Sequence, residues 1–254
     1  MPTLLPILSV EHPCQPQQYP KPRFRAISTR DRLRPEVVAY LPEHNALITR
    51  FVPGKLLNAE DVQSPDTMGR IAQTLRRCHD APIPDHLGEF SVFQTVRDYL
   101  NLAAEKNVTM PTSLVEALTA LQRVEKGLNS SHPQVLTHND LLAANFIDDG
   151  VNLRVIDWEY GGKGDRFFDL GNFAANLQLT EQQEQALLHA YFGEVRPEDL
   201  RHLQIMRLAS DLREAAWGYL QSGISKLHSP KYYLDYGAKH FDRFSAAARK
   251  ANVV

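Results

Sequence analysis

Residues 138–145 read HNDLLAAN, and this octapeptide is the most informative segment of the 254-residue sequence. His138 is followed two positions later by Asp140, and Asn145 comes five positions after the aspartate. An aspartate can align a hydroxyl group and accept its proton. An asparagine supplies a neutral oxygen ligand of the kind that Mg²⁺ prefers. The segment therefore predicts a site where a hydroxyl group reacts beside a hard cation.

A second acidic segment follows at a fixed distance. Asp157 lies twelve residues after Asn145, at the end of the strand-like run 153–158. Asp149-Gly150 is a tight-turn signal between this run and the strand-like run 145–148, so the two strands should pair. Pairing would bring Asp157 beside Asn145, close enough for both to bind one Mg²⁺.

Glu159 lies two residues beyond Asp157 on the same face of the expected strand. We predict that it binds a second metal through water, or that it is a solvated carboxylate. The spacing of His138, Asp140, Asn145 and Asp157 equals that of the catalytic loop and metal-binding aspartate of kinases, which predicts Asp140 as the catalytic base.

The composition of the sequence excludes several classes of binding partner. The formal net charge is −2 with lysine and arginine scattered along the chain, so we expect no nucleic-acid partner. No apolar run approaches the roughly 20 residues that span a bilayer, and residues 1–10 lack the basic start of a signal peptide. Cys14 and Cys78 are too few for a disulfide framework or a metal knuckle. We expect a cytoplasmic protein that does not bind membranes; its oligomeric state is not predicted.

The order of elements predicts an α+β fold with two lobes and a cleft between them. Prolines make residues 1–35 an irregular arm. Residues 36–54 form a remnant N-terminal lobe, with a hairpin of strands 37–40 and 46–51 followed by a hinge at 51–54. Residues 55–254 form a large helical C-terminal lobe that holds the catalytic β insert.

Within the C-terminal lobe, several helix limits can be predicted. Ser64 and Pro65 favour the start of a helix, and Thr180 with Gln183 resembles a capping box. Periodic apolar residues indicate further helices at 92–104, 113–126, 197–221 and 232–250. A third short strand is expected at 134–137.

The sequence segments around these motifs resemble those of a known protein family. Residues 137–147 read THNDLLAANFI, residues 156–165 read IDWEYGGKGD, and residues 168–172 read FDLGN. These segments are similar to the signature segments of the choline/ethanolamine kinase branch of the aminoglycoside phosphotransferase superfamily, whose fold is protein-kinase-like. The resemblance extends from about residue 35 to the C-terminus.

The resemblance implies roles for individual residues. Asp140 is the implied base, with ATP and Mg²⁺ as cofactors and Asn145 and Asp157 as metal ligands. The implied nucleotide-binding residues are Phe51, Val52 and Gly54, in the interlobe linker.

The helix 214–221 is similar to a family helix with two tryptophans that enclose a quaternary ammonium. Trp217 matches the second tryptophan, and Glu214 stands in place of the first. The implied substrate-binding residues are Glu214, Trp217, Tyr160 and Asp169, with His138 and Asp165 as structural residues near the site.

Two of these assignments have alternatives. Trp217 is either a cation contact, through an attraction of about 0.5–2 kcal/mol, or a core residue of an amphipathic helix. Asp169 is either a substrate ligand or a helix N-cap.

One feature departs from the family pattern. The family begins with a glycine-rich phosphate loop and a strand lysine, whereas the first glycine here is Gly54 and Lys21 is flanked by prolines. We therefore expect a truncated N-terminal lobe. The predicted function is an ATP- and Mg²⁺-dependent kinase for the hydroxyl of a small cationic alcohol, choline or ethanolamine first. The alternatives are a thiamine kinase, an aminoglycoside phosphotransferase, or a pseudokinase-type binding module.

Overall fold

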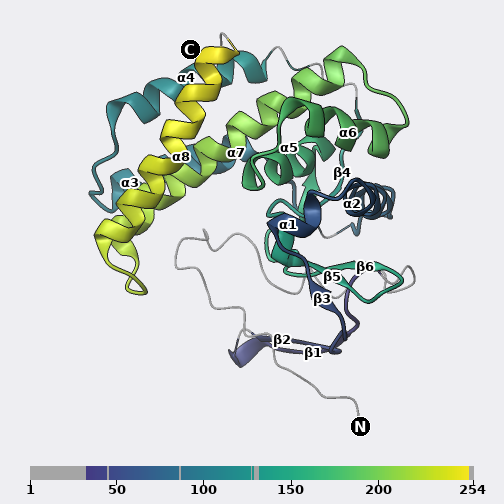
Figure 1. Ribbon diagram of the computed structural model, residues 1–254. Coiled ribbons are helices and arrows are strands. Elements are labelled where there is room, and N and C mark those ends of the chain that lie inside the picture. Colours follow the sequence, from purple (N-terminus) through teal and green to yellow (C-terminus); the bar gives the residue numbers. More distant parts are fainter. Residues whose placement is uncertain (1–32, 45, 86, 127, 129–131, 252–254) are drawn as a thin grey trace.

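The computed structural model describes residues 33–44, 46–85, 87–126, 128 and 132–251 (Figure 1). Cys14, Lys21 and most of the predicted irregular arm lie outside these residues. The last part of that arm, residues 33–35, is buried, and the Leu33 carbonyl accepts a hydrogen bond from the Val155 amide. These three residues therefore pack onto the body of the protein.

The linker at residues 50–54 joins two small antiparallel sheets. Strand β1 (Val37–Leu41) pairs with β2 (Ala46–Thr49) around the 3₁₀ turn η2 (Pro42–His44), which confirms the predicted hairpin. The other sheet has the order β3 (Lys55–Leu56), β5 (Phe146–Asp148), β6 (Leu153–Val155). A Cβ on Gly54 would lie 2.5 Å from the Asp148 carbonyl oxygen. Only glycine lets the linker approach β5 this closely.

The β5–β6 hairpin confirms the turn at Asp149-Gly150. Asp149 Oδ1 accepts hydrogen bonds from the amides of residues 151 and 152, and Gly150 has a φ of 86°. Strand β6 ends at Val155, three residues before the predicted end at Trp158. Asp157 has a φ of 64°, a left-handed conformation that cannot continue a strand.

The rest of the described chain is mostly helical, as predicted. Pro65 occupies the first turn of α2, and the capping box of Thr180 and Gln183 is present at the start of α6. A third strand pair, β4 with β7, lies inside this helical part. The remaining elements are α1 (Ala59–Val62), α2 (Pro65–His79), α3 (Val92–Glu105), α4 (Thr112–Glu125), β4 (Val135–Thr137), η3 (Ala143–Asn145), β7 (Gly162–Gly164), α5 (Arg166–Asn176), α6 (Glu181–Phe192), α7 (Pro197–Ile224) and α8 (Pro230–Lys250).

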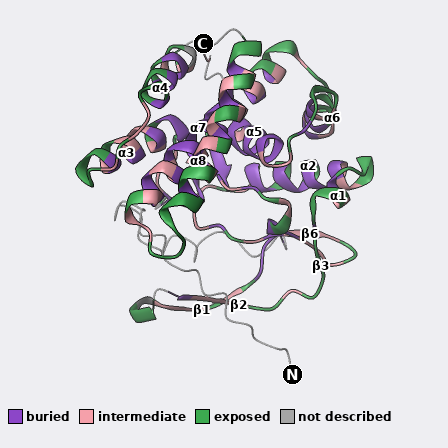
Figure 2. Cartoon of the chain, turned by 60° about the vertical axis from the view of Figure 1, so that its left-hand side comes forward, coloured by how far each residue is buried: buried purple, intermediate pink, exposed green. Residues whose placement is uncertain are grey.

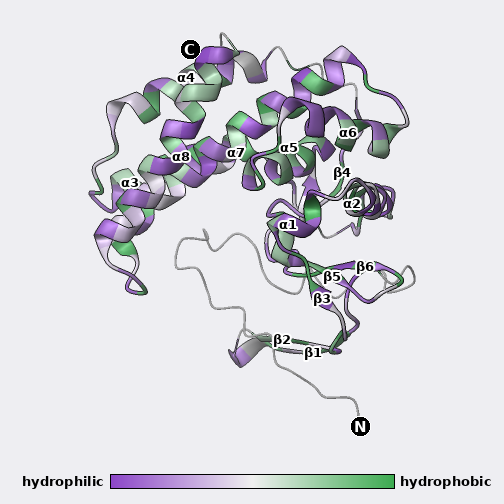
Figure 3. Cartoon of the chain, in the orientation of Figure 1, coloured by the Kyte–Doolittle hydropathy of each residue, from purple (hydrophilic) through white to green (hydrophobic). Residues whose placement is uncertain are grey.

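Helix α7 is the central element of the core. It packs against α3, α5 and α8, and Figure 2 shows it largely buried between them. Figure 3 shows both hydrophilic and hydrophobic residues along α8, as expected of a helix with one face toward the core.

A close helix crossing brings α8 against α7. A Cβ on Gly218 of α7 would lie 2.7 Å from the Gly237 amide nitrogen of α8. The two backbones can approach this closely because neither residue has a side chain. The crossing also brings Tyr236 of α8 against Glu214 and Trp217 of α7. Within the described ranges, no helix is both long and apolar enough to cross a membrane.

Candidate active site

One buried carboxylate, that of Asp169, binds the backbone of the loop after β4. Asp169 of α5 accepts the His138 amide through Oδ2 and the Asn139 amide through Oδ1, both at 2.7 Å. The Nε2 atom of buried His79 lies 3.0 Å from Oδ2. Asn139 has a φ of 70°, and such a conformation persists only where its surroundings hold it. Asp169 therefore anchors the loop that carries Asp140.

Asp169 lies within helix α5 and not at its start. The predicted N-cap role is wrong, because Asp165 caps α5 by accepting the Phe167 amide at 2.8 Å. Asp169 is 1% exposed. It lies beneath the loop, away from the pocket that contains the other predicted substrate residues.

His138 joins the loop to the segment after β6. Its Nε2 lies 2.8 Å from the Ile156 carbonyl oxygen, and its Nδ1 accepts the Asp140 amide at 3.2 Å. A carbonyl can only accept, so Nε2 carries the proton and Nδ1 is the acceptor. The buried ring also contacts Trp158, with 4.8 Å between ring centroids. These contacts fix the loop relative to Asp157.

Asn145 and Asp157 lie on adjoining segments. The Ile156 amide donates to the Asn145 carbonyl at 2.9 Å, so the residue before Asp157 is bonded to residue 145. The side-chain amide nitrogen of Asn145 donates to the Asp140 carbonyl at 2.8 Å, which leaves the amide oxygen as the remaining acceptor. Asp157 is exposed. Mg²⁺ is commonly bound by one or two protein oxygens together with substrate phosphates, and this donor set fits that pattern.

The geometric basis of the prediction for Glu159 is absent. β6 ends at Val155, so Asp157 and Glu159 do not share the face of a strand. Glu159 instead lines a pocket together with Asp140. Within the described ranges, no three side chains of the His, Cys, Asp or Glu type form a metal-binding group.

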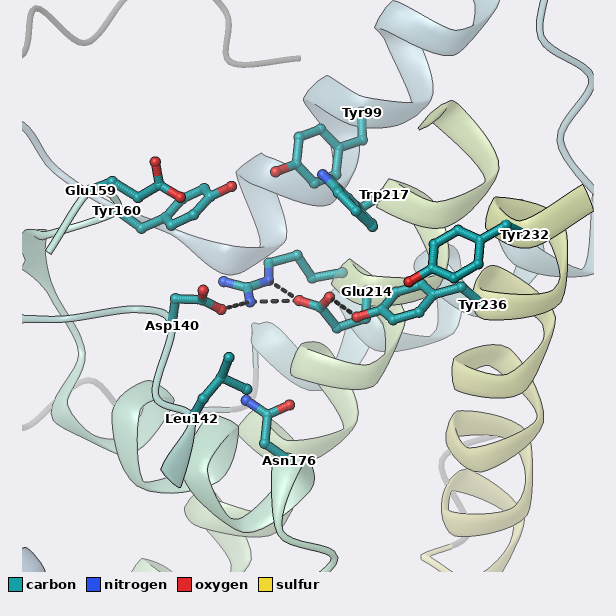
Figure 4. Close-up of a pocket in the computed structure, with 11 residues that line it drawn as sticks. Tyr99, Asp140, Leu142, Glu159, Tyr160, Asn176, Glu214, Trp217, Tyr232 and Tyr236 are labelled. Carbon is teal, nitrogen blue, oxygen red and sulfur yellow. Dashed lines mark hydrogen bonds and ion pairs between the residues drawn. The ribbon is translucent and has the colours of Figure 1, made fainter. Parts of the chain in front are cut away.

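Asp140 opens into a pocket of about 200 Å³ (Figure 4). Its wall combines aromatic rings with acidic groups. Figure 4 shows Glu159 and Tyr160 beside Asp140, with Trp217 and Tyr99 on α7 and α3 and two more tyrosines at the α8 end. The lining residues are Tyr99, Asp140, Leu142, Glu159, Tyr160, Asn176, Arg213, Glu214, Trp217, Tyr232 and Tyr236.

A chain of polar contacts crosses the floor of this pocket. Arg213 Nη2 donates to Asp140 Oδ1 at 3.0 Å and to Glu214 Oε1 at 2.6 Å. The Tyr236 hydroxyl donates to Glu214 Oε2 at 2.6 Å. The loop that carries Asp140, helix α7 and helix α8 are thereby linked at one point.

These contacts set the charges in the pocket. Burial raises the pKa of Asp140 above its ordinary value, and the Arg213 guanidinium acts in the opposite direction. Burial alone would also raise the pKa of Glu214, but the Arg213 charge and the hydrogen bonds from Tyr236 and Arg213 hold that pKa below its usual range. Burial, with the neighbouring Glu214 charge, raises the pKa of the Tyr236 hydroxyl. Tyr236 therefore remains a hydrogen-bond donor to an ionised Glu214.

The predicted nucleotide-binding residues lie elsewhere. Phe51, Val52 and Gly54 belong to the connection between β2 and β3. Gly54 contacts β5, the strand that begins directly after Asn145, and Phe51 is exposed. None of the three lines the pocket of Asp140.

The pocket unites five predicted residues, Asp140, Glu159, Tyr160, Glu214 and Trp217. Six further lining residues were not predicted from the sequence, namely Tyr99, Leu142, Asn176, Arg213, Tyr232 and Tyr236. The spacing of Tyr232 and Tyr236 is a signal for the last two, because residues four apart on a helix share a face.

Comparison with known proteins agrees with this architecture. The family profile of choline/ethanolamine kinase matches residues 38–191. A probable ethanolamine kinase of Arabidopsis thaliana is 24% identical over 223 residues, which are 76% of this chain and 58% of that protein. The chain therefore spans less than two thirds of that relative's length.

Solved structures share the fold. A choline/ethanolamine kinase family protein from Mesorhizobium loti is 27% identical with a TM-score of 0.76, covering 90% of this chain and 80% of that one. LicA in complex with AMP is 20% identical with a TM-score of 0.70, covering 87% and 75% respectively. The predicted kinase-like fold and family are confirmed. The chain belongs to the choline/ethanolamine kinase family.

Proposed function

We propose that this protein transfers the γ-phosphoryl group of ATP to the hydroxyl of a small cationic alcohol, with choline and ethanolamine as the first candidates. One observation carries the proposal. The aspartate of the kinase-type loop, Asp140, lies in the wall of a pocket that is lined mainly by aromatic rings and carboxylates.

The pocket suits a cation. Its lining has three carboxylates, Asp140, Glu159 and Glu214, and one guanidinium, Arg213, so the formal balance is negative. Aromatic faces attract an ammonium group by about 0.5–2 kcal/mol each. The pocket of about 200 Å³ is smaller than the roughly 300–1,000 Å³ of sites for drug-sized ligands. Both properties favour a compact ammonium alcohol.

The loop residues supply the chemistry of transfer. Arg213 occupies Oδ1 of Asp140, so Oδ2 is the oxygen that aligns the acceptor hydroxyl. The hydroxyl oxygen bonds to the γ-phosphorus, the bond to the β-phosphate oxygen breaks, ADP leaves, and Asp140 takes the hydroxyl proton. Asn145 and Asp157 would hold Mg²⁺, which when bound neutralises charge on the phosphate oxygens.

Nucleotide binding is proposed at the linker of Phe51, Val52 and Gly54, and the AMP in the LicA structure supports a nucleotide as the phosphoryl donor. Because ATP is an intracellular metabolite, we place the protein in the cytoplasm.

The alternatives differ in what the pocket must accept. An aminoglycoside carries several amines and needs a broad acidic site, which disfavours it here. A thiamine kinase would present a larger cation to the same rings. A pseudokinase would bind the cation without turnover.

The test is acceptor-dependent release of ADP from MgATP. Choline, ethanolamine, thiamine and kanamycin are compared as acceptors, with glycerol as an uncharged control. We expect ADP release with choline or ethanolamine and none with glycerol. ADP release with kanamycin as the only active acceptor would reject the proposed substrate class. So would the absence of ADP release with every acceptor tested.

A further inference from the structure

Arg213 is the most completely buried charged group of the pocket. It is 4% exposed, and its guanidinium carbon lies 5.5 Å from the centroid of Phe168 and 5.8 Å from that of Tyr160. Its Nη1 donates to the Asn139 carbonyl, its Nη2 to Asp140 and Glu214, and its Nε to Glu214 at 2.9 Å. Four hydrogen bonds thus join this one side chain to three residues, Asn139, Asp140 and Glu214.

This bonding pattern argues against a role in binding an anionic ligand. A guanidinium has five N–H donors in a rigid fork. Four of them already have acceptors within the protein, and the rings of Phe168 and Tyr160 pack near the guanidinium. Arg213 therefore acts on protein groups.

The acceptors of Arg213 are the ones that orient the base. Asn139 has a φ of 70°, and its carbonyl directly precedes Asp140 in the chain. Arg213 holds this carbonyl and Oδ1 of Asp140 at the same time, which restricts both the loop backbone and the rotation of the carboxylate. On the other side it holds Glu214, which Tyr236 fixes from α8.

We propose that Arg213 is a positioning residue that fixes Asp140 for transfer and couples it to the acceptor pocket through Glu214. This inference rests on the proposed function. Arg213 would set the orientation of the base, so its loss should lower kcat. It would not raise the KM for a cationic acceptor, because removing a positive charge leaves the pocket more negative.

The variants must separate positioning from the stability of a buried ion pair. Arg213→Met leaves the largely buried Glu214 without its charge partner, which destabilises a protein, whereas removing both charges is often nearly neutral. The double variant Arg213→Met/Glu214→Gln therefore recovers stability without restoring the contact to Asp140.

Arg207 on the same helix provides the matched control. It pairs with buried Glu184 and donates to a backbone carbonyl, that of Leu179. Neither Arg207 nor Glu184 lines the pocket of Asp140. The control variants are Arg207→Met and Arg207→Met/Glu184→Gln.

The measurements are the melting temperature, kcat, and the two KM values with MgATP and the best acceptor. We expect Arg213→Met and its double variant to lose about 100-fold in kcat, the cost of a misplacement of about 1 Å. The KM for ATP should stay unchanged, and only the double variant should regain its melting temperature. Both Arg207 variants should keep the wild-type kcat. A double variant of Arg213 and Glu214 that regains both melting temperature and kcat would overturn the proposal.

A crystal structure of the double variant keeps the two proposals distinguishable. If wild-type protein releases no ADP with any acceptor, the proposed function fails, and positioning is judged from coordinates alone. We expect the Asp140 carboxylate to leave its wild-type place. An unchanged Asp140 in the double variant would refute the positioning role regardless of activity.

Discussion

Replacing Asp169 by asparagine should uncouple the catalytic loop from the core. The Asp169 carboxylate accepts two backbone amides at 2.7 Å, and hydrogen bonds to a charged group contribute about 1.5–3 kcal/mol each. Asparagine keeps one acceptor oxygen but turns an NH₂ donor toward the second amide. We expect a loss of roughly 2–4 kcal/mol, which corresponds to a decrease of roughly 4–16 °C in melting temperature for a protein of this size.

The same change should lower kcat, because Asp140 follows the two anchored amides directly. A base that is displaced by about 1 Å costs on the order of 100-fold in rate. The assay combines thermal unfolding with steady-state ADP release at a temperature where the variant is folded.

Asp199→Asn provides the control for this prediction. Asp199 is 1% exposed and pairs with Arg196 at 2.7 Å, and it lies fourteen residues before Arg213 on α7, or about 21 Å along the helix. It should lower stability without lowering kcat. A folded Asp169→Asn variant with the wild-type kcat would refute the anchoring role.

Three further predictions concern the pocket, the metal and a surface ion pair. Trp217→Leu removes one aromatic face and with it a cation–π attraction of up to about 2 kcal/mol, so the KM for the cationic acceptor should rise by up to roughly thirty-fold with the KM for ATP unchanged. A lower melting temperature with an unaltered acceptor KM would instead make Trp217 a core residue. Asp157→Ala should raise the Mg²⁺ concentration for half-maximal turnover by more than about tenfold, and an unchanged Mg²⁺ titration would exclude it as a ligand. The hydrogen bond from Arg70 lowers the pKa of Asp148, so the pair stabilises the fold above the unfolded-state pKa of about 3.9 and this stabilisation is lost as the pH falls through the lower folded-state pKa. The melting-temperature difference between wild type and Arg70→Met should therefore be largest near neutral pH and shrink below about pH 4, and a constant difference would contradict this.

Local signals predicted much of the fold. The turn at Asp149-Gly150, the proline at the start of α2 and the capping box at Thr180 each depend on contacts within about four residues. The end of β6 was not predicted, because the β-branched and aromatic residues Val155, Ile156 and Trp158 make the run through Trp158 strand-like. Asp157 has a positive φ, and the residue before it, Ile156, is hydrogen-bonded to Asn145 and His138, contacts that no local pattern encodes.

The candidate site was predictable where spacing is set by chemistry and unpredictable where packing sets it. Asp140 and Asn145 follow from the loop pattern. The contacts of Arg213 join residues 73 and 74 positions apart, and no local pattern encodes them. Tyr99 enters the pocket from α3 for the same reason.

Asp140 is proposed to drive phosphoryl transfer to an alcohol bound in the aromatic pocket. The most direct test compares wild type with Asp140→Asn in acceptor-dependent ADP release, with MgATP affinity measured separately by calorimetry. We expect that the variant keeps its melting temperature and MgATP affinity and loses about 10²–10⁴-fold in kcat. A variant that binds MgATP and turns over at the wild-type rate would contradict it.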